Sequence, residues 1–399
     1  MSITGATIDH LVSTTLVVAV ILVFIGLANQ TLQSATVYQS QRNLDARCSG
    51  LLDSMLYSPG VPSYWGIYSS APTVFGLQDP VSSENQLSSF SLMRLGSGTQ
   101  TVYYSKTGAF YNNMTIGQGD SLLEPVTEIV DYIAASQLLG INGTYGFQLT
   151  LKPTVTVSVS MTQSNPSLSF SVNAKGTGAP LANGTVSYCL IVIGFQSGYP
   201  SYSLINGTGT LDNLGSTFLS FSGVSGSSSF VLFAYAYLPG LVGMGYYKHV
   251  TDNSNYVAPI VFDVGTGQVV LAHSYDIDGQ SSTAALTYNA TFISVGDDLA
   301  FVNNPLQNSY GTIDSGAGNP YGTLTISYGS CGILVIAYEK SWGGPSTTGL
   351  SLMPWGIGPL AFPITFGDSP AGKEWVSTDL RQVVMGNVAY QALLSLWSM

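Results

Sequence analysis

Charged side chains are scarce in this sequence. Only 8% of its 399 residues are Asp, Glu, Lys or Arg, against roughly a quarter in a typical soluble domain. The 10 basic residues are outnumbered by 21 acidic ones, which gives a formal net charge of -11. So few cations argue against binding to phosphate backbones and exclude a nucleic-acid partner. Intrinsic disorder is excluded as well, because 45% of the residues are hydrophobic and the charge is low.

Cysteine is equally rare. Cys48, Cys189 and Cys331 form no Cys-x-x-Cys pair and have no neighbouring histidine, so a zinc site is not expected. We expect Cys48 to be a buried apolar side chain. An oxidising environment would allow a disulfide between Cys189 and Cys331, although the sequence alone does not fix the pairing.

Catalytic motifs are missing too. The Gly-x-Ser-x-Gly nucleophile elbow, the phosphate-binding loop and the dinucleotide fingerprint are absent, and no carboxylate pair is marked out as a glycosidase site. We therefore expect no enzymatic activity and no cofactor. One polar cluster, from His273 to Gly279, could bind Ca²⁺ through Asp276 and Asp278. It lacks the further acidic ligands of an EF-hand loop, and a hairpin turn is the alternative.

A long apolar run lies near the start of the sequence. Residues 11–28 (LVSTTLVVAVILVFIGLA) are mostly aliphatic, and no Asp, Glu, Lys or Arg occurs between His10 and Arg42. Such a run is long enough to span a bilayer as a helix, and it is apolar on all sides. We expect a membrane or a filament core to surround Leu11, Leu16, Val20, Val23, Phe24 and Leu27. A secretory signal peptide is the alternative, but the basic residues that usually begin one are missing.

The helical pattern continues beyond the apolar run. Leu44, Cys48, Leu51, Leu52 and Met55 recur on one helix face until the Pro- and Gly-containing residues 58–62 interrupt it. This predicts one helix of about 45 to 50 residues. Its second half is amphipathic, and we expect the apolar face to pack against the following head.

Six Asn-x-Ser/Thr sequons follow the apolar run. They are the glycosylation candidates Asn29, Asn113, Asn142, Asn183, Asn206 and Asn289. A chain rich in Asn, Ser and Thr also forms sequons by chance. Together with the charge-poor body of the chain, they favour a cell-surface protein that is anchored by its N-terminal helix, with residues from about 30 onward outside the cell.

The rest of the sequence reads as three segments. Residues 58–153 predict an α+β head region, with a second helix between Pro125 and Leu138 and an alternating strand from Tyr145. Residues 154–250 contain short alternating strands separated by turns, the pattern of an immunoglobulin-like β-sandwich.

Residues 251–399 predict a second β-rich module, with loops around Trp342 to Gly358. The predicted fold class is therefore mainly β with a long N-terminal hydrophobic helix (residues 1–57), in which an α+β unit precedes β-sandwich modules.

A family resemblance emerges from the first 150 or so residues. It rests on the 11–56 helix, the segment from Leu51 to Gly60 that leads to Tyr64-Trp65-Gly66, Phe75-Gly76-Leu77, and the passage from Leu138 to Phe147. In these features the chain resembles archaeal pilin-like surface proteins, with the N-terminal helix of type IV pilins and archaellins. The resemblance implies that the apolar helices bundle in a filament core or anchor the subunit in a membrane, while β-rich heads face solvent.

One feature departs from that family. Archaeal prepilins carry Lys or Arg with Gly or Ala just before the helix, where a peptidase cuts, but here no Lys or Arg precedes Leu11. The resemblance therefore leaves open whether the N-terminus is processed, and whether the helix builds a filament or a single anchor.

Two functional hypotheses follow. The first is an extracellular structural protein, either a pilin-like subunit or an adhesion or surface-layer component, which forms a homo-oligomer or lattice through its N-terminal helix. The second is a membrane-anchored carbohydrate-binding protein or hydrolase that acts in a cleft between β-modules.

Overall fold

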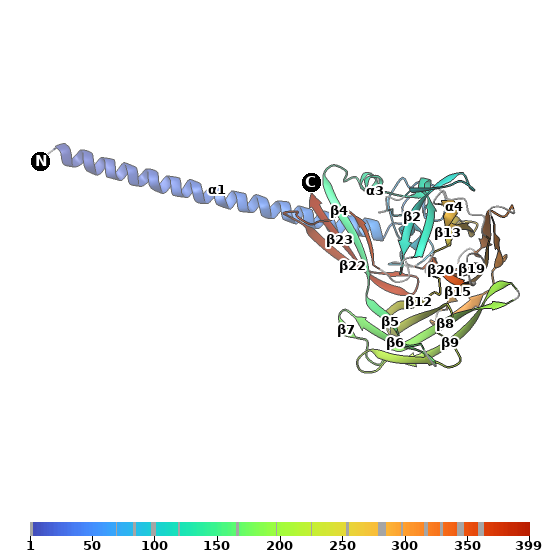
Figure 1. Cartoon of the computed structure of the whole chain (residues 1–399). Helices are drawn as coiled ribbons and strands as arrows, with labels where there is room; N and C mark the ends of the chain where they lie inside the picture. The colour runs from blue at the N-terminus through green and yellow to red at the C-terminus, as the bar shows by residue number, and fades with distance from the viewer. Residues whose placement is uncertain are drawn as a thin grey trace.

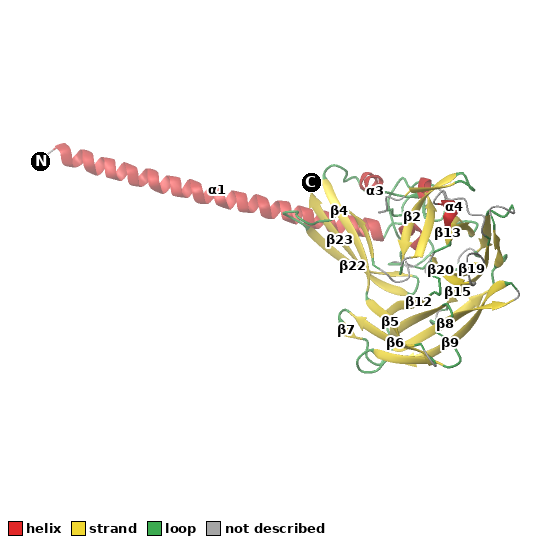
Figure 2. Ribbon diagram, viewed as in Figure 1, coloured by secondary structure: helices red, strands yellow, loops and turns green. Residues whose placement is uncertain are grey.

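A single helix projects far from a β-rich head (Figure 1). The structure, a computed structural model, describes residues 3–399 except 69, 83–84, 97–100, 119, 165–166, 197, 225, 253–254, 278–284, 297, 315–317, 328–329, 341–346 and 358–362. Strands dominate the head, and the few other helices are short (Figure 2). The predicted class, mainly β with a long N-terminal apolar helix, is confirmed.

Helix α1 (Ile3–Leu56) contains 54 residues and is therefore about 80 Å long. No proline interrupts it, and the first one, Pro59, follows its end. Gly60 then adopts a left-handed conformation with φ 77°, which suits glycine because it has no Cβ. The side chains of residues 9–40 are all exposed, and the head begins to cover the helix at Gln41.

The last turns of α1, from Gln41 to Leu56, are embedded in the head, and we call them the foot. Cys48, Leu52 and Met55 are completely buried there, while Leu44 and Leu51 are partly buried against the same core. The foot packs on β22 (Ser377–Met385) and β23 (Val388–Ser398). These strands belong to a sheet of order β21 (Ile364–Gly367), β4 (Tyr145–Pro153), β23 and β22.

A six-stranded sheet joins the middle of the chain to an earlier segment. Its order is β1 (Thr101–Tyr104), β2 (Ala109–Ile116), β3 (Asp120–Pro125), β13 (Val257–Asp263), β14 (Gln268–His273) and β18 (Tyr321–Thr325). Its one parallel pair is β3 with β13. Backbone hydrogen bonds of this sheet and of the β4–β23 pair therefore connect the segments 58–153 and 251–399 that were predicted to be separate.

Residues 154–250 form two sheets of their own. One consists of β5 (Val155–Gln163), β6 (Leu168–Gly176), β7 (Ala179–Pro180) and β10 (Ser216–Phe221). The other has the order β12 (Leu241–His249), β11 (Phe230–Leu238), β8 (Thr185–Gln196) and β9 (Tyr199–Thr210). Alternate residues of β6, such as Phe170 and Val172, pack with Leu190 and Leu232 of the facing sheet. This shared core makes the pair a β-sandwich.

The last sheet lies between two others. It has the order β16 (Phe301–Asn304), β15 (Leu286–Val295), β19 (Gly332–Lys340) and β20 (Thr347–Trp355), with β17 (Tyr310–Ile313) beside β15. Along β19, Val335 belongs to the core shared with the β8–β12 sheet, and Leu334 and Ile336 belong to the core shared with the six-stranded sheet. Burial on both faces explains why β19 is a continuous apolar run.

Two sequence predictions about local structure were wrong. The second helix, α3 (Tyr132–Leu138), begins seven residues after Pro125, with the Asp131 carboxylate accepting the N–H of Ala134 as its N-cap. The preceding residue, Val130, is held extended because its N–H donates to the carbonyl of Arg94. In the segment predicted as loops around Trp342 to Gly358, residues 347–355 form strand β20.

The buried foot of α1 predicts a contrast between two leucines of the same helix. Leu52→Ala should lower the free energy of unfolding of the head by about 2–5 kcal/mol, because it opens a cavity in the core. Leu32→Ala, at a position 66% exposed, should change it by less than about 0.5 kcal/mol. Urea unfolding of the detergent-dispersed protein, followed by tryptophan fluorescence, measures both. Equal effects would contradict the packing of the foot.

Candidate functional site

The shaft of α1, residues 9–40, is the most unusual surface of the molecule. The side chains predicted for a membrane or filament core, Leu11, Leu16, Val20, Val23, Phe24 and Leu27, are all at least half exposed and lie outside the head. Leu11 is 69% exposed and Phe24 71%. Exposing apolar surface to water costs about 25 cal/mol per Å². A continuous exposed apolar surface such as that of residues 11–28 marks an interaction site. The shaft is long and apolar enough to span a membrane.

The second part of the shaft, together with Gln41 where the head begins to cover the helix, has a different chemistry over residues 29–41. It is rich in Gln, Ser and Thr and contains no charged residue. Several hydroxyls donate back to the carbonyl four residues earlier, as Ser34 does to Gln30 and Thr36 to Leu32. With no charges, this segment has no i,i+4 ion pairs to support it, and a lone helix of this kind is only marginally stable in water.

Polar contacts lock the foot of α1 to the β22–β23 hairpin. Arg381 on β22 donates to the carboxylates of Asp53 (3.0 Å) and Asp379 (2.7 Å) and to the Ser49 hydroxyl (3.0 Å). Ser377 donates to Asp45 at 2.6 Å. Although partial burial alone would raise the pKa of Asp379, hydrogen bonds from Ser49 and Arg381 hold it below its ordinary value.

The cysteines do not form a reactive centre. All three are free, so the disulfide considered for Cys189 and Cys331 is not formed in this structure. Burial raises the pKa of the Cys48 thiol to about 11 and that of Cys189 to about 12. Both thiols therefore stay protonated near neutral pH and act as apolar packing groups.

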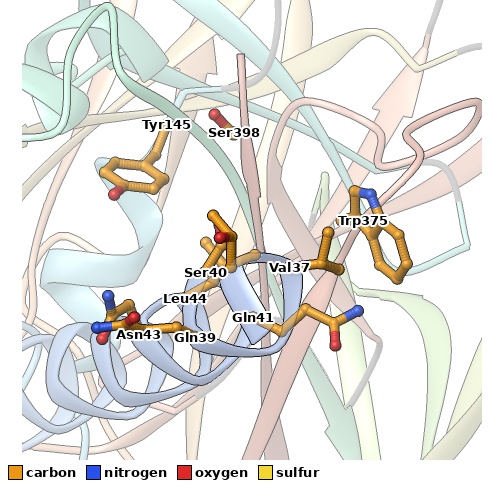
Figure 3. A pocket seen from close by; sticks show the side chains of 10 residues that line it. Val37, Gln39, Ser40, Gln41, Asn43, Leu44, Tyr145, Trp375 and Ser398 are labelled. Atoms are coloured by element: carbon orange, nitrogen blue, oxygen red, sulfur yellow. The ribbon is translucent and has the colours of Figure 1, made fainter. Parts of the chain in front are cut away.

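A hollow of about 450 Å³ lies where the shaft enters the head. Side chains of α1, including Val37, Gln41 and Leu44, form one wall, and Tyr145 and Trp375 from the head face them (Figure 3). We call this hollow the collar; its remaining lining residues are Thr36, Gln39, Ser40, Asn43 and Ser398. All ten lining residues are uncharged.

Sequence reasoning did not find the collar. Tyr145 begins β4, Trp375 precedes β22, and Ser398 ends β23. These segments meet only because β4 pairs with β23, a contact between residues more than 200 positions apart. No local pattern predicts such a pairing. The sequence offered one signal, a tryptophan at position 375 after the small and polar residues 369–374.

Buried charges in the head serve structural roles. The Asp120 carboxylate of β3 accepts from Lys248 of β12 (2.7 Å) and from the Leu352 N–H of β20 (3.1 Å), and so joins three sheets. Burial raises the pKa of Asp120, and the charge of Lys248 opposes this shift.

A second buried carboxyl lies on the same strand. Glu124 pairs with Asn112 across β2–β3, and one of its oxygens, Oε2, is buried without a hydrogen-bond partner. Burial raises the pKa of Glu124 well above its ordinary value, with a smaller opposing effect from Arg94. Arg94 itself donates to the carbonyls of Glu128, Tyr68 and Ser70.

The predicted Ca²⁺ ligands differ in what the structure shows of them. Asp276 is buried on the short helix α4 (Ser274–Ile277), whereas Asp278 lies outside the described residues. Burial lowers the pKa of the neighbouring His273, and the charge of Asp276 opposes this shift. Within the described ranges, no group of three His, Cys, Asp or Glu side chains could hold a metal ion.

The six sequons occupy different environments. Asn29, Asn142 and Asn183 are exposed on the shaft and in two turns. Asn206 is exposed but its amide donates to the Phe301 carbonyl, and the half-buried Asn289 donates to that of Pro200. Asn113 is half-buried in β2. Attachment of a glycan suits the exposed turns at Asn142 and Asn183 and would displace the amide contacts of Asn206 and Asn289. Asn29 is exposed as well, but it directly follows the apolar run of α1.

Comparisons with known proteins give no family. No protein-family model matches the chain, and no curated protein matches it. Among solved structures, a two-domain fibronectin type III segment from chicken tenascin has 10% sequence identity and a TM-score of 0.14. The match covers 52% of this chain and 99% of that one. A TM-score this low gives no basis for assigning fold or function.

The buried carboxyl of Glu124 predicts an unusual pH dependence. Because its pKa is higher in the folded than in the unfolded protein, the folded state holds more protons, and stability falls as pH rises above about 4.5. Glu124→Gln, which is neutral at every pH, should raise the free energy of unfolding at pH 7, with the gain shrinking toward pH 4. Urea unfolding across this pH range tests it, with exposed Glu374→Gln as the control. Parallel curves for Glu124→Gln and wild type would contradict the prediction.

Proposed function

We propose that the protein is an extracellular structural component of a cell surface, held in place by α1. The observation that carries the proposal is the bare apolar shaft beside a deeply embedded foot. A helix with these two parts connects an apolar environment to a folded head without a flexible linker. The buried contacts of Cys48, Leu52 and Met55 fix the end of α1 in the head, and the continuous helix carries the shaft away from it.

Self-assembly is the form of this function that the shaft supports best. A membrane would surround residues 11–28, but it would leave residues 29–41, about 20 Å of uncharged helix, between the lipid and the head. Neighbouring copies of the same helix would cover both parts at once. We therefore propose a pilin-like subunit whose helices pack together, with membrane anchoring as its unassembled state.

The head fits display at a surface. We propose that the sandwich of residues 154–250 is immunoglobulin-like and that the head as a whole presents contact surfaces. Because only 8% of the residues are charged, few charged side chains would have to lose hydration when like copies come into contact. The resemblance to archaeal pilin-like proteins supports the same proposal.

The carbohydrate hypothesis has less support. Three hollows in the described part of the chain are lined by uncharged residues alone, so none of these three offers the carboxylate pair of a glycosidase. The aromatic and amide side chains of the collar are compatible with sugar binding. This alternative would be favoured if the protein stayed soluble with its shaft uncovered and bound a specific glycan.

The proposal predicts that one charge in the middle of the shaft disrupts attachment. Val20→Asp places a carboxylate where it costs about 2.5–3.5 kcal/mol in an apolar surrounding, roughly a hundredfold in partitioning. We expect the variant to appear in the supernatant after ultracentrifugation, whereas wild type sediments with membranes or fibres that electron microscopy can distinguish.

The matched control is Val81→Asp, the same change at a head position that is 74% exposed. It should sediment like wild type. If Val20→Asp sedimented normally as well, the shaft would not be the attachment element, and the structural proposal would fail.

A further inference from the structure

Lys248 and Asp120 form a buried ion pair between two parts of the head. Lys248 lies on β12 of the sandwich, and Asp120 lies on β3 of the six-stranded sheet. The ammonium Nζ is 2.7 Å from the carboxylate Oδ1, and the two side chains are 11% and 1% exposed. Removing two charges from water in this way is costly unless further hydrogen bonds satisfy both groups.

The hydrogen bonds of Asp120 are distributed unequally over its two oxygens. Oδ1 accepts from Lys248 and also from the Leu352 N–H of β20, at 3.1 Å. Oδ2 is buried and has no hydrogen-bond partner. A carboxylate oxygen without a partner in the interior is unfavourable. An ion pair that served stability alone would satisfy both oxygens, so Oδ2 points to a further role of the pair.

We propose that Lys248 and Asp120 condense to an amide that joins the sandwich covalently to the six-stranded sheet. Nζ attacks Cγ of Asp120, so that the Nζ–Cγ bond forms and the Cγ–Oδ2 bond breaks. The ammonium loses two protons to Oδ2, which leaves as water. The reaction is a condensation without any change of oxidation state, and it needs no co-reactant.

The surroundings of the pair favour each part of this reaction. Burial raises the pKa of Asp120, although the charge of Lys248 opposes the shift. Transfer of one proton from Nζ to Oδ2 turns the ion pair into a neutral amine, which is nucleophilic, and a neutral carboxylic acid. The Leu352 N–H stabilises the negative charge that Oδ1 carries after Nζ has added to Cγ. Because the fold holds the two groups in contact, little entropy is lost when they react.

The product removes what is unfavourable in the ion pair. Both buried charges disappear, the unpartnered Oδ2 leaves, and Oδ1 becomes an amide oxygen that can still accept from Leu352. The titration of Asp120 therefore belongs to the unlinked pair alone. The new bond closes a loop between residues 120 and 248 that contains strands β5 to β11. Closing so long a loop restricts the unfolded chain and stabilises the head.

Mass spectrometry of a tryptic digest tests the bond. The full-length protein is produced in a host that does not glycosylate it, and is folded, purified and then denatured. Trypsin cuts after Lys and Arg, but not before Pro153 and not after an acylated lysine. The unlinked chain therefore gives the separate peptides 107–175, 176–248 and 249–340. In the linked chain, peptides 107–175 and 176–340 should appear as one species, lighter than their sum by one water molecule, and peptide 176–248 should be absent.

Two lysine variants are the controls. Lys248→Arg keeps the positive charge beside Asp120, but its guanidinium is a poor nucleophile because it stays protonated. Peptides 107–175 and 176–248 of this variant should be recovered separately. Lys106→Arg changes an exposed lysine and should retain the cross-linked species. Fragmentation of that species should place the bond between Lys248 and Asp120.

The results separate this inference from the proposed function, because the bond lies in the head and does not involve α1. Recovery of peptide 176–248 with an unmodified Lys248 from the folded wild-type protein would overturn the inference. A cross-link that fragmentation assigns to another carboxyl group would overturn it as well. Either result leaves the sedimentation of the protein unchanged, so the attachment through α1 is judged by its own experiment.

Discussion

The structure depends on one constraint: the two parts of the continuous helix α1 need different environments. The foot of α1 lies in the protein core around Cys48 and Leu52, while the shaft exposes an apolar surface that water does not tolerate. No proline divides these two parts. Whatever covers the shaft is therefore coupled rigidly to the head, and the head's orientation is fixed by the helix rather than by a linker.

The head is built to withstand that coupling. Its last strands return along the chain to pair with β4, and the β22–β23 hairpin packs against the foot. The end of the chain closes this arrangement, since the N–H of Met399 donates to the carbonyl of Thr144. A force on the shaft acts on β22 and β23, which contact α1. Through their sheet it is transmitted to β4, more than 200 residues earlier in the chain.

Local pattern predicted the parts of this fold that depend on neighbours in sequence. The apolar run and the spacing from Leu44 to Met55 predicted α1, and the alternation in residues 155–163 predicted β5. Local pattern did not predict contacts between distant segments: Val130 is extended because it bonds to Arg94, and β4 lies in the sheet under α1 because it pairs with β23. The collar is invisible for the same reason, since it exists only where β4, β22 and α1 meet.

The scarcity of charge also shapes how the head responds to acid. Acid unfolding usually follows the loss of ion pairs whose carboxylates have lowered pKa values. Here Asp379 is such a group, and its contribution is lost as pH falls through its folded pKa. Glu124 and Asp120 act in the opposite sense, because burial raises their pKa values and protonation relieves the cost of a buried charge. The contribution of Asp379 therefore falls on acidification, whereas those of Glu124 and Asp120 fall as pH rises.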